Sequence, residues 1–336
     1  WDGKYTGKGR LWALLSGERG QYELALSNVR ENNFTLDGCC MLKDAARARL
    51  DAILSVYDSG RYFVNALRAR VVPVLGDITD PDLGVSSETY RELQQEIELV
   101  IHAAASVNLI ASYDELEPIN VQGTRHVANL SLASGAPFVY VSSYSVLGDK
   151  MYERDFVFKE TDLEVDQNFF EGMRYEQSKF EAERVVRGMG AKGLRWSIVR
   201  PGNIFGDSET GCYPLRGTTE TGIYYDILRT VVETGFSFDY AQCFDVTPVD
   251  YVAKAIVRLS TQTHTGQTYH LTNPASPSFN DLVGALRACG YTVRTLALDD
   301  YLWALAESRL VRAGRPYTSN FTKMMAFFVG EEDLVE

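Results

Sequence analysis

The sequence predicts an α/β protein in which a doubly wound parallel sheet of the Rossmann type is joined to a smaller, mostly helical C-terminal domain. Two observations predict this class. Short apolar runs alternate with helical stretches through the first two thirds of the 336 residues, a rhythm typical of a parallel sheet with helices on both faces. The run Phe-Val-Tyr-Val at 138–141 is also continuously apolar, as a strand buried on both faces should be.

The predicted elements follow one another in a regular order. Strands are expected at 11–15, 38–42, 71–75, 99–103, 138–142 and 196–200, and helices between them at 21–31, 44–56, 87–97, 120–133 and 175–189. After about Gly206 the order loosens, and a strand and a helix return within 245–259, followed by a strand at 268–271. The rest of the chain is expected to be mostly helical, with helices at 279–289 and 300–313.

Composition and charge argue against several classes of function. The chain has 33 Lys and Arg residues against 45 Asp and Glu, a formal net charge of -12. Binders of duplex nucleic acid rely on cationic contacts to phosphate, so this balance speaks against one. No uninterrupted apolar run reaches the roughly 18 residues of a membrane span. The five cysteines show no zinc spacing, so we expect no metal site and a reduced, cytoplasmic protein.

A glycine-containing turn follows the first predicted strand. Ser16, Gly17 and Gly20 have the spacing of a dinucleotide fingerprint, in which a pyrophosphate meets the N-terminus of the next helix. The third glycine position of that fingerprint is occupied by Glu23. A surface turn would show the same two glycines, so this motif alone leaves both interpretations open.

Cations follow the second predicted strand. Lys43 and Arg47, with Arg49 nearby, stand where a Rossmann sheet approaches the adenosine ribose of a dinucleotide. Cations at this place accommodate a 2′-phosphate and favour NADP over NAD. The alternative is a solvated helix start with Asp44 as its cap.

The next two strand ends add further candidates for cofactor binding. Asp77 and Ile78 follow the third predicted strand, where Asp77 could accept a hydrogen bond from the adenine amine. Ala103 and Ala104 follow the fourth, where small side chains let the backbone pass close to a cofactor, although tight packing would use the same residues. An NADP-binding core is therefore expected at 1–206, with 246–273 returning to it, and a substrate-facing domain from 207–245 and 274–336.

The most informative residues are Ser143, Tyr175 and Lys179. Ser143 follows the strand end at 138–142, and about 30 residues later Tyr175 and Lys179 lie four apart, on one face of a helix. A phenol has a reference pKa of about 10, and we expect the neighbouring ammonium to lower it. The three side chains could hold a carbonyl oxygen and supply a proton while a nicotinamide supplies hydride.

With these motifs the chain resembles the extended short-chain dehydrogenases/reductases. More narrowly, it resembles the terminal thioester reductase domains of non-ribosomal peptide synthetases, some polyketide synthases and carboxylic acid reductases. Besides Ser143, Tyr175 and Lys179, the resemblance is carried by VPVLGD at 72–77, HAAASVN at 102–108, NVQGT at 120–124, RPGNIFGDSETG at 200–211 and TPVDYVA at 247–253.

The resemblance implies a reaction and a partner. Such domains use NADPH to reduce an acyl or peptidyl thioester, carried on the phosphopantetheine arm of a carrier domain, to an aldehyde and in some members to an alcohol. It implies that Tyr175 is the proton donor, that Lys179 tunes it and binds the ribose, and that Lys43 contacts the 2′-phosphate. Ser143 would hold the substrate oxygen, and Pro201 and Asn203 would line the cofactor. The chain, which begins at Trp1 rather than Met, is expected to be a domain cut from a longer synthase and monomeric when excised.

Two other interpretations stay open at this point. The family normally has a third glycine where this chain has Glu23, so a redox-silent release domain, either a Dieckmann-type cyclase or a pseudo-reductase, is the first alternative. The second is another enzyme of the extended class, which would act on a free small molecule and need no carrier.

Overall fold

The structure is a computed structural model. It describes residues 10–14, Ala48, Val72 and the range 74–307, except for 110, 154, 214–222, 242, 244, 263 and 265. The predicted glycine turn, the strand at 38–42, the helix at 21–31 and nearly all of the helix at 44–56 lie outside the described residues.

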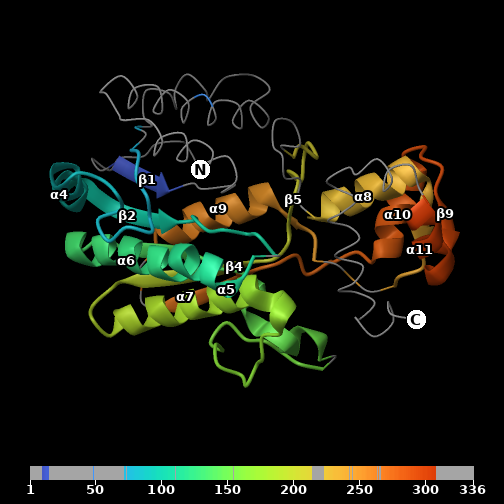
Figure 1. Cartoon of the computed structure of the whole chain (residues 1–336). Helices are drawn as coiled ribbons and strands as arrows, with labels where there is room; N and C mark the ends of the chain where they lie inside the picture. Colours follow the sequence, from blue (N-terminus) through green and yellow to red (C-terminus); the bar gives the residue numbers. More distant parts are fainter. Residues whose placement is uncertain are drawn as a thin grey trace. The chain divides into compact units, whose positions relative to one another are not determined.

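A parallel sheet organises the larger part of the described chain (Figure 1). Its five strands are ordered β1-β2-β3-β4-β8, and each neighbouring pair is parallel. The strands are β1 (Arg10–Leu14), β2 (Ile97–His102), β3 (Phe138–Val141), β4 (Trp196–Pro201) and β8 (Gln267–Leu271). The predicted parallel α/β sheet is thereby confirmed.

Helices cover both faces of this sheet. The main ones are α4 (Ser87–Glu96), α6 (Gly123–Ser134), α7 (Arg174–Gly190) and α9 (Val249–Ser260). Shorter elements are α5 (Tyr113–Glu117), the π-helical η1 (Pro118–Gln122), the 3₁₀ segments η2 (Tyr144–Tyr152) and η3 (Glu171–Met173), and the parallel pair β5 (Ile204–Phe205) and β7 (Thr247–Pro248).

Alternate residues of each strand point to opposite faces, which explains why β3 is apolar throughout. Phe138 and Tyr140 belong to a core cluster that includes side chains of α6 and α7. Val139 belongs to a second cluster on the other face, which includes Val252 of α9. A strand with helices on both sides has no solvent-facing side, so each of its positions favours an apolar residue.

One predicted strand, at 71–75, is wrong for the residues that can be assessed. Val72, Val74 and Leu75 are not in a strand, and Val72 is 52% exposed. The segment leads into a turn that is closed by a hydrogen bond from Asp77 N to Leu83 O (2.7 Å). An apolar run forms a central strand only where both of its faces become buried, and here one residue of the run faces water.

The chain divides into two compact units, the first made of Trp1–Tyr213 and Thr247–Thr272 and the second of Pro214–Val246 and Asn273–Glu336. The second unit contains α8 (Ile223–Thr234), α10 (Phe279–Ala288), α11 (Leu298–Glu307) and the parallel pair β6 (Phe236–Phe238) and β9 (Arg294–Leu296). Phe238 lies in its core, with its ring against those of Phe279 and Tyr301. In the described part of the chain, no helix has the length and apolar character needed to cross a membrane.

Candidate active site

The candidate site begins where β3 ends. Ser143 has an extended backbone and caps η2: its Oγ accepts a hydrogen bond from Ser145 N (3.2 Å) and lies 2.7 Å from Ser145 Oγ. The carboxyl ends of parallel strands are the usual ligand-binding edge of a sheet of this type. The structure therefore places Ser143 at the edge where chemistry is expected.

Helix α7 brings Lys179 to the same strand end. The Lys179 side chain is buried, and its Nζ donates a hydrogen bond to Val141 O (2.8 Å), two residues before Ser143. The ammonium also lies 4.5 Å from the centre of the Tyr140 ring, a cation–π contact. Tyr175 lies one turn earlier on α7 and is half-buried.

Burial shifts the pKa values of both Lys179 and Tyr175. It lowers the pKa of Lys179 to about 7, against the opposing charge of Glu183. Burial also raises the pKa of Tyr175, and the charge of Glu176 raises it further. The expectation that the lysine lowers the pKa of the phenol is therefore wrong for this structure, because the ammonium is bound to Val141 O and desolvation prevails. A raised pKa keeps the phenol protonated near neutral pH, as a proton donor must be.

A buried ion pair that is not among the predicted site residues lies one turn beyond Lys179. Glu183 and Arg200 are both fully buried, and the guanidinium donates from Nε to Oε1 and from Nη2 to Oε2 of the carboxylate, each at 2.8 Å. Ser142 Oγ donates a third hydrogen bond to Glu183 Oε1 (2.6 Å). The pair joins α7 to the ends of β3 and β4.

A second group of missed residues fixes the start of α7. Asn120, in the π-helical turn η1, accepts from Ser106 N (2.7 Å) and donates to Ser178 Oγ (2.8 Å). Ser178 Oγ donates in turn to Tyr175 O (2.6 Å). A π-helical turn inside a helical segment is frequent at functional sites, and here it places a buried amide beside the backbone of Tyr175.

The predicted cofactor residues that follow β4 and β2 lie at the same edge of the sheet. Pro201 is the buried last residue of β4, and Asn203 donates through Nδ2 to the hydroxyl of Tyr144 (3.4 Å), which adjoins Ser143. Ala104 is buried and Ala103 half-buried, directly after β2. The cofactor roles of these residues stay a prediction.

The residues predicted to contact adenine have defined surroundings. Asp77 Oδ1 accepts from Thr79 N (2.8 Å) and Thr79 Oγ1 (2.7 Å), so that oxygen is engaged in a local turn. Ile78 O is 2.9 Å from His126 Nδ1, and a Cβ at Gly123 would come within 2.8 Å of the Ile78 side chain. Ile78 therefore packs against the start of α6. The predicted residues Ser16, Gly17, Gly20, Lys43 and Arg47 lie outside the described residues.

Glu176 carries a testable consequence for stability. Among the described residues its Oε2 is buried without a hydrogen-bond partner, and burial raises the pKa of this carboxyl from 4.5 to about 7. The folded chain then binds a proton that the unfolded chain has lost between these two pH values, so this group's contribution to stability falls as pH rises through that window. We expect Glu176→Gln to be more stable than the wild type by about 1–2 kcal/mol at pH 8.

Urea unfolding at pH 5 and pH 8 measures this difference in both proteins. At pH 5 the wild-type carboxyl is largely protonated in the folded state, and the gain from Glu176→Gln should shrink markedly. An equal gain at both pH values would show that the charge of Glu176 is not its cause.

The fold and the site together define the class of the protein. The parallel sheet is of the Rossmann type, and the family and structural neighbours of the chain are NAD(P)-dependent reductases of the extended short-chain dehydrogenase/reductase class. The family model described as "Male sterility protein" matches residues 40–256, and the chain belongs to this family of NAD-binding domains.

Individual relatives agree with this assignment. A linear gramicidin synthase of Brevibacillus parabrevis is 29% identical over 301 residues, which is 88% of this chain and 6% of that protein. The L-2-aminoadipate reductase large subunit of Eremothecium gossypii is 29% identical over 310 residues, 88% of this chain and 21% of that protein. The chain thus spans only a small part of these relatives.

A solved structure gives the same result. The terminal R domain from the myxalamid PKS-NRPS biosynthetic pathway superposes with a TM-score of 0.71 at 33% identity, covering 82% of this chain and 68% of that one. The resemblance to terminal reductase domains seen in the sequence is confirmed. In the part of the chain that is described, no cluster of His, Cys, Asp and Glu side chains could hold a metal ion.

Proposed function

We propose that this domain reduces a thioester-bound acyl or peptidyl chain, presented on the phosphopantetheine arm of a carrier domain, and releases it as an aldehyde with NADPH as the reductant. The observation that carries the proposal is the arrangement of Ser143, Tyr175 and Lys179 around one strand end in a chain whose relatives include a named reductase. Acyl recognition and carrier contact are assigned to the second unit, which contains most of 207–245 and 274–336.

The described residues suit a nicotinamide nucleotide. An ammonium has three N–H donors, and among the described residues Lys179 Nζ makes one hydrogen bond, to Val141 O. Donors thus remain for the hydroxyl groups of a ribose. The side chains of Ala103 and Ala104 after β2 are small, so a flat ring could approach the backbone closely there. NADPH would supply the hydride.

The residues of this chain would then manage the oxygen and the proton. Ser143 Oγ donates a hydrogen bond to the thioester carbonyl oxygen, and the hydroxyl of Tyr175 gives that oxygen a proton as hydride adds to the carbon. The resulting thiohemiacetal loses the pantetheine thiol, with its proton, and leaves an aldehyde. Lys179 holds the nucleotide and lies one turn from the donor. Redox-silent release is less well supported, because the relatives include a reductase.

The test is a set of acyl-pantetheine thioesters, offered free and on a fused carrier domain, with NADPH consumption followed and products identified by mass. We expect one NADPH oxidised per aldehyde formed, or two where an alcohol appears, and faster turnover on the fused carrier. Tethering raises the effective concentration to about the millimolar range. Product release without NADPH consumption would establish the redox-silent alternative. Preference for a free small-molecule carbonyl compound would establish the third interpretation.

Cofactor preference depends on Lys43, with help from Arg47. A charge-assisted contact to a 2′-phosphate contributes about 1.5–3 kcal/mol, roughly 10–150-fold in affinity. We expect the wild type to bind NADPH more tightly than NADH, and Lys43→Ala to lose most of that preference while its affinity for NADH changes little. Fluorescence titration of both nucleotides measures this, and equal affinities in the wild type would refute the assignment of Lys43.

A further inference from the structure

Two hydrogen bonds join the end of β3 to helix α7. They link two consecutive residues at the strand end to two residues that lie one turn apart on the helix. Val141 O accepts from Lys179 Nζ (2.8 Å), and Ser142 Oγ donates to Glu183 Oε1 (2.6 Å). The next residue of the chain is Ser143. Because residues four apart share a helix face, these two contacts fix how far α7 can slide or turn against the strand that carries Ser143.

Arg200 fixes the position of the Glu183 carboxylate. The guanidinium makes two parallel hydrogen bonds to the carboxylate, a geometry more specific than a single contact. The same guanidinium donates from Nη2 to Asp162 O (2.7 Å), lies 3.2 Å through Nη1 from His270 Nε2, and stacks 4.5 Å from the ring of Phe158. These contacts fix the guanidinium of Arg200, and the two parallel hydrogen bonds then leave the Glu183 carboxylate little freedom to turn. Arg187 Nη2, one turn further along α7, lies 3.8 Å from Glu183 Oε2.

A contribution to folding stability does not by itself explain why this ion pair is buried here. Removing two charges from water costs several kcal/mol per ion, and well-packed apolar side chains often replace a buried ion pair with equal or better stability. The pair is also placed one helical turn from Lys179, and Glu183 acts on the charge of that lysine.

We propose that Glu183 is a positioning residue for the reductase site, which sets Ser143 against Tyr175 and Lys179 and gives the buried Lys179 ammonium its counter-charge. This inference rests on the proposed function. Glu183 does not touch the reacting atoms, and it acts through Lys179 and through the strand end.

The proposed effect of Glu183 on the charge of Lys179 can be measured, because few charged groups face this ammonium. Burial lowers the pKa of Lys179, and Glu183 is the charge that opposes this. The groups facing the ammonium are the ring of Tyr140 from β3 and His102 from β2; burial lowers the pKa of His102 to about 3, so it stays neutral. On α7 itself lie the neutral phenol of Tyr175 and Glu183. Two cations face Glu183, Arg200 of β4 at 2.8 Å and Arg187 of α7 at 3.8 Å.

The sign of the expected shift follows directly. If reduction needs Lys179 protonated, the rate falls as pH rises through its pKa. Without the negative charge of Glu183 that pKa is lower still, so the alkaline limb of the pH–rate profile should move to lower pH. A purely structural role for Glu183 would lower the amount of folded protein without moving this limb.

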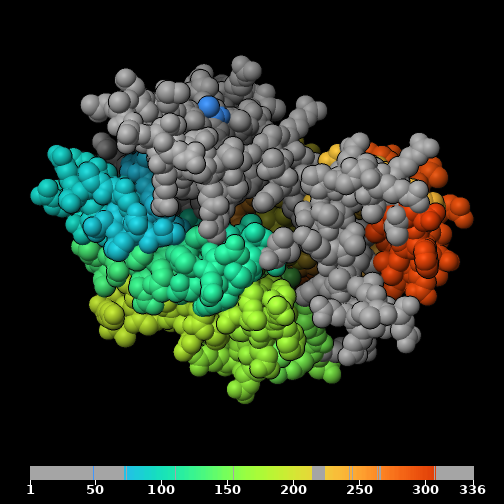
Figure 2. Space-filling view, in the orientation of Figure 1, coloured from blue at the N-terminus to red at the C-terminus, as the bar shows by residue number. Residues whose placement is uncertain are grey.

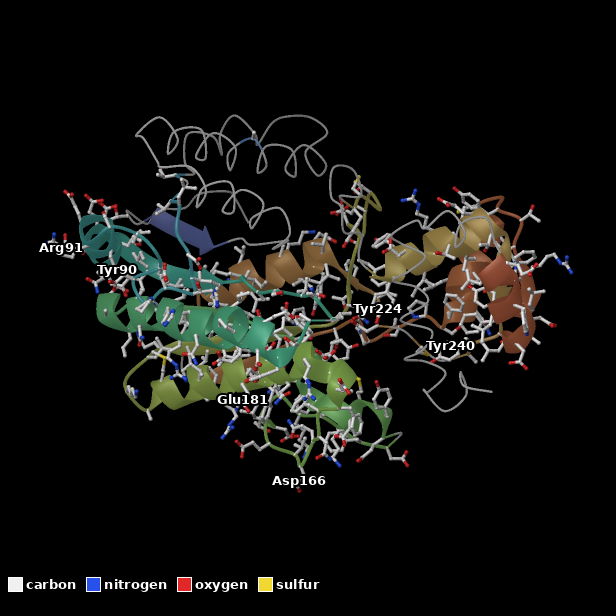
Figure 3. The ribbon with its side chains drawn as sticks, viewed as in Figure 1. Tyr90, Arg91, Asp166, Glu181, Tyr224 and Tyr240 are labelled. Atoms are coloured by element: carbon white, nitrogen blue, oxygen red, sulfur yellow. The ribbon has the colours of Figure 1, made fainter. Side chains whose placement is uncertain are left out.

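The main variant is Glu183→Gln, and its matched control is Glu181→Gln. Glu181 lies on the same helix and loses the same charge, but its side chain is 31% exposed and pairs with Arg184 (3.2 Å) (Figure 3). Single-turnover reduction of a carrier-bound thioester at saturating NADPH, measured from about pH 5 to pH 10, gives the profile. For Glu183→Gln we expect the alkaline limb of the pH–rate profile to move to lower pH by about one pH unit. Its rate at pH 7 should fall about tenfold, while KM for the thioester changes little. The control Glu181→Gln should keep the wild-type rate and profile.

A second variant, Ser142→Ala, covers the case in which Glu183→Gln does not fold. It removes the strand-end hydrogen bond and leaves the ion pair with Arg200 intact, so we expect about a tenfold lower rate with the alkaline limb in place. If Ser142→Ala keeps the wild-type rate, or if folded Glu183→Gln matches Glu181→Gln in rate and limb, the positioning role is overturned.

Thioester reduction by the wild-type protein tests the proposed function separately from the role of Glu183. If the wild type reduces no thioester, the proposed function fails. NADPH affinity measured over the same pH range then replaces the rate, because Lys179 is also assigned to the nucleotide. A downward shift in the binding profile of Glu183→Gln, absent in Glu181→Gln, would still support the electrostatic role, and identical binding profiles would overturn it.

Discussion

Tyr175→Phe is expected to lower the single-turnover rate of thioester reduction by about 10²–10⁴-fold, the usual cost of losing a general acid, while NADPH still binds. Burial and the charge of Glu176 raise the pKa of the phenol, so near neutral pH the hydroxyl is protonated and available as a donor. Phenylalanine keeps the ring and its packing and removes only that hydroxyl. Rapid mixing of the NADPH-loaded protein with an acylated carrier measures the rate.

A matched control is Tyr90→Phe on α4. Tyr90 is also half-buried and packs against the core of the first unit, but it lies on α4, before β2 (Figure 3). Its loss of a hydroxyl should leave the reduction rate unchanged. A near-wild-type rate for Tyr175→Phe would remove this residue from the mechanism. Lys179→Ala, by contrast, should reduce both the rate and the affinity for NADPH.

The sheet could be predicted where burial on both faces makes the local pattern unambiguous. The continuous apolar run of β3 has helices on both sides of it, and the run at 138–142 was assigned correctly to within a residue. The run at 71–75 is also apolar, yet Val72 faces water, and its described residues Val72, Val74 and Leu75 are not in a strand. Sequence alone does not show which apolar runs become covered on both faces.

In the candidate site, too, residues that share a local pattern could be predicted, and contacts between distant segments could not. Tyr175 and Lys179 were found because four-residue spacing on one helix is visible in the sequence. The Glu183–Arg200 pair joins α7 to β4, and charged residues on a helix are usually a solvated face. A signal was present nevertheless, because Lys179 and Glu183 share the periodicity of the buried Val186 and so fall on the core-facing side of α7. The direction of the Tyr175 pKa shift is set by burial of the phenol and by the charge of Glu176, and the four-residue spacing shows neither.

Replacing Arg200 should have the largest effect on stability. Arg200→Met keeps an unbranched apolar side chain against Phe158 but removes both guanidinium hydrogen bonds of the fully buried Glu183 carboxylate. The remaining cation is Arg187, whose Nη2 lies 3.8 Å from Glu183 Oε2. Removing one partner of a buried ion pair typically costs about 3–5 kcal/mol of unfolding free energy. Urea unfolding of the variant and the wild type at pH 7 measures this loss.

Arg184→Met is the matched control for this change. Arg184 lies on the same helix as Glu183, and its side chain is 51% exposed. The segment of the chain that contains this helix is coloured yellow-green in Figure 2. It pairs with Glu164 (3.3 Å) and Glu181 (3.2 Å) at the surface. Such exposed pairs contribute about 0–1 kcal/mol, so the control should unfold close to the wild type. Equal losses in Arg200→Met and Arg184→Met would show that the buried pair has no special place in the fold. A loss confined to Arg200→Met would assign the cost to the buried ion pair with Glu183.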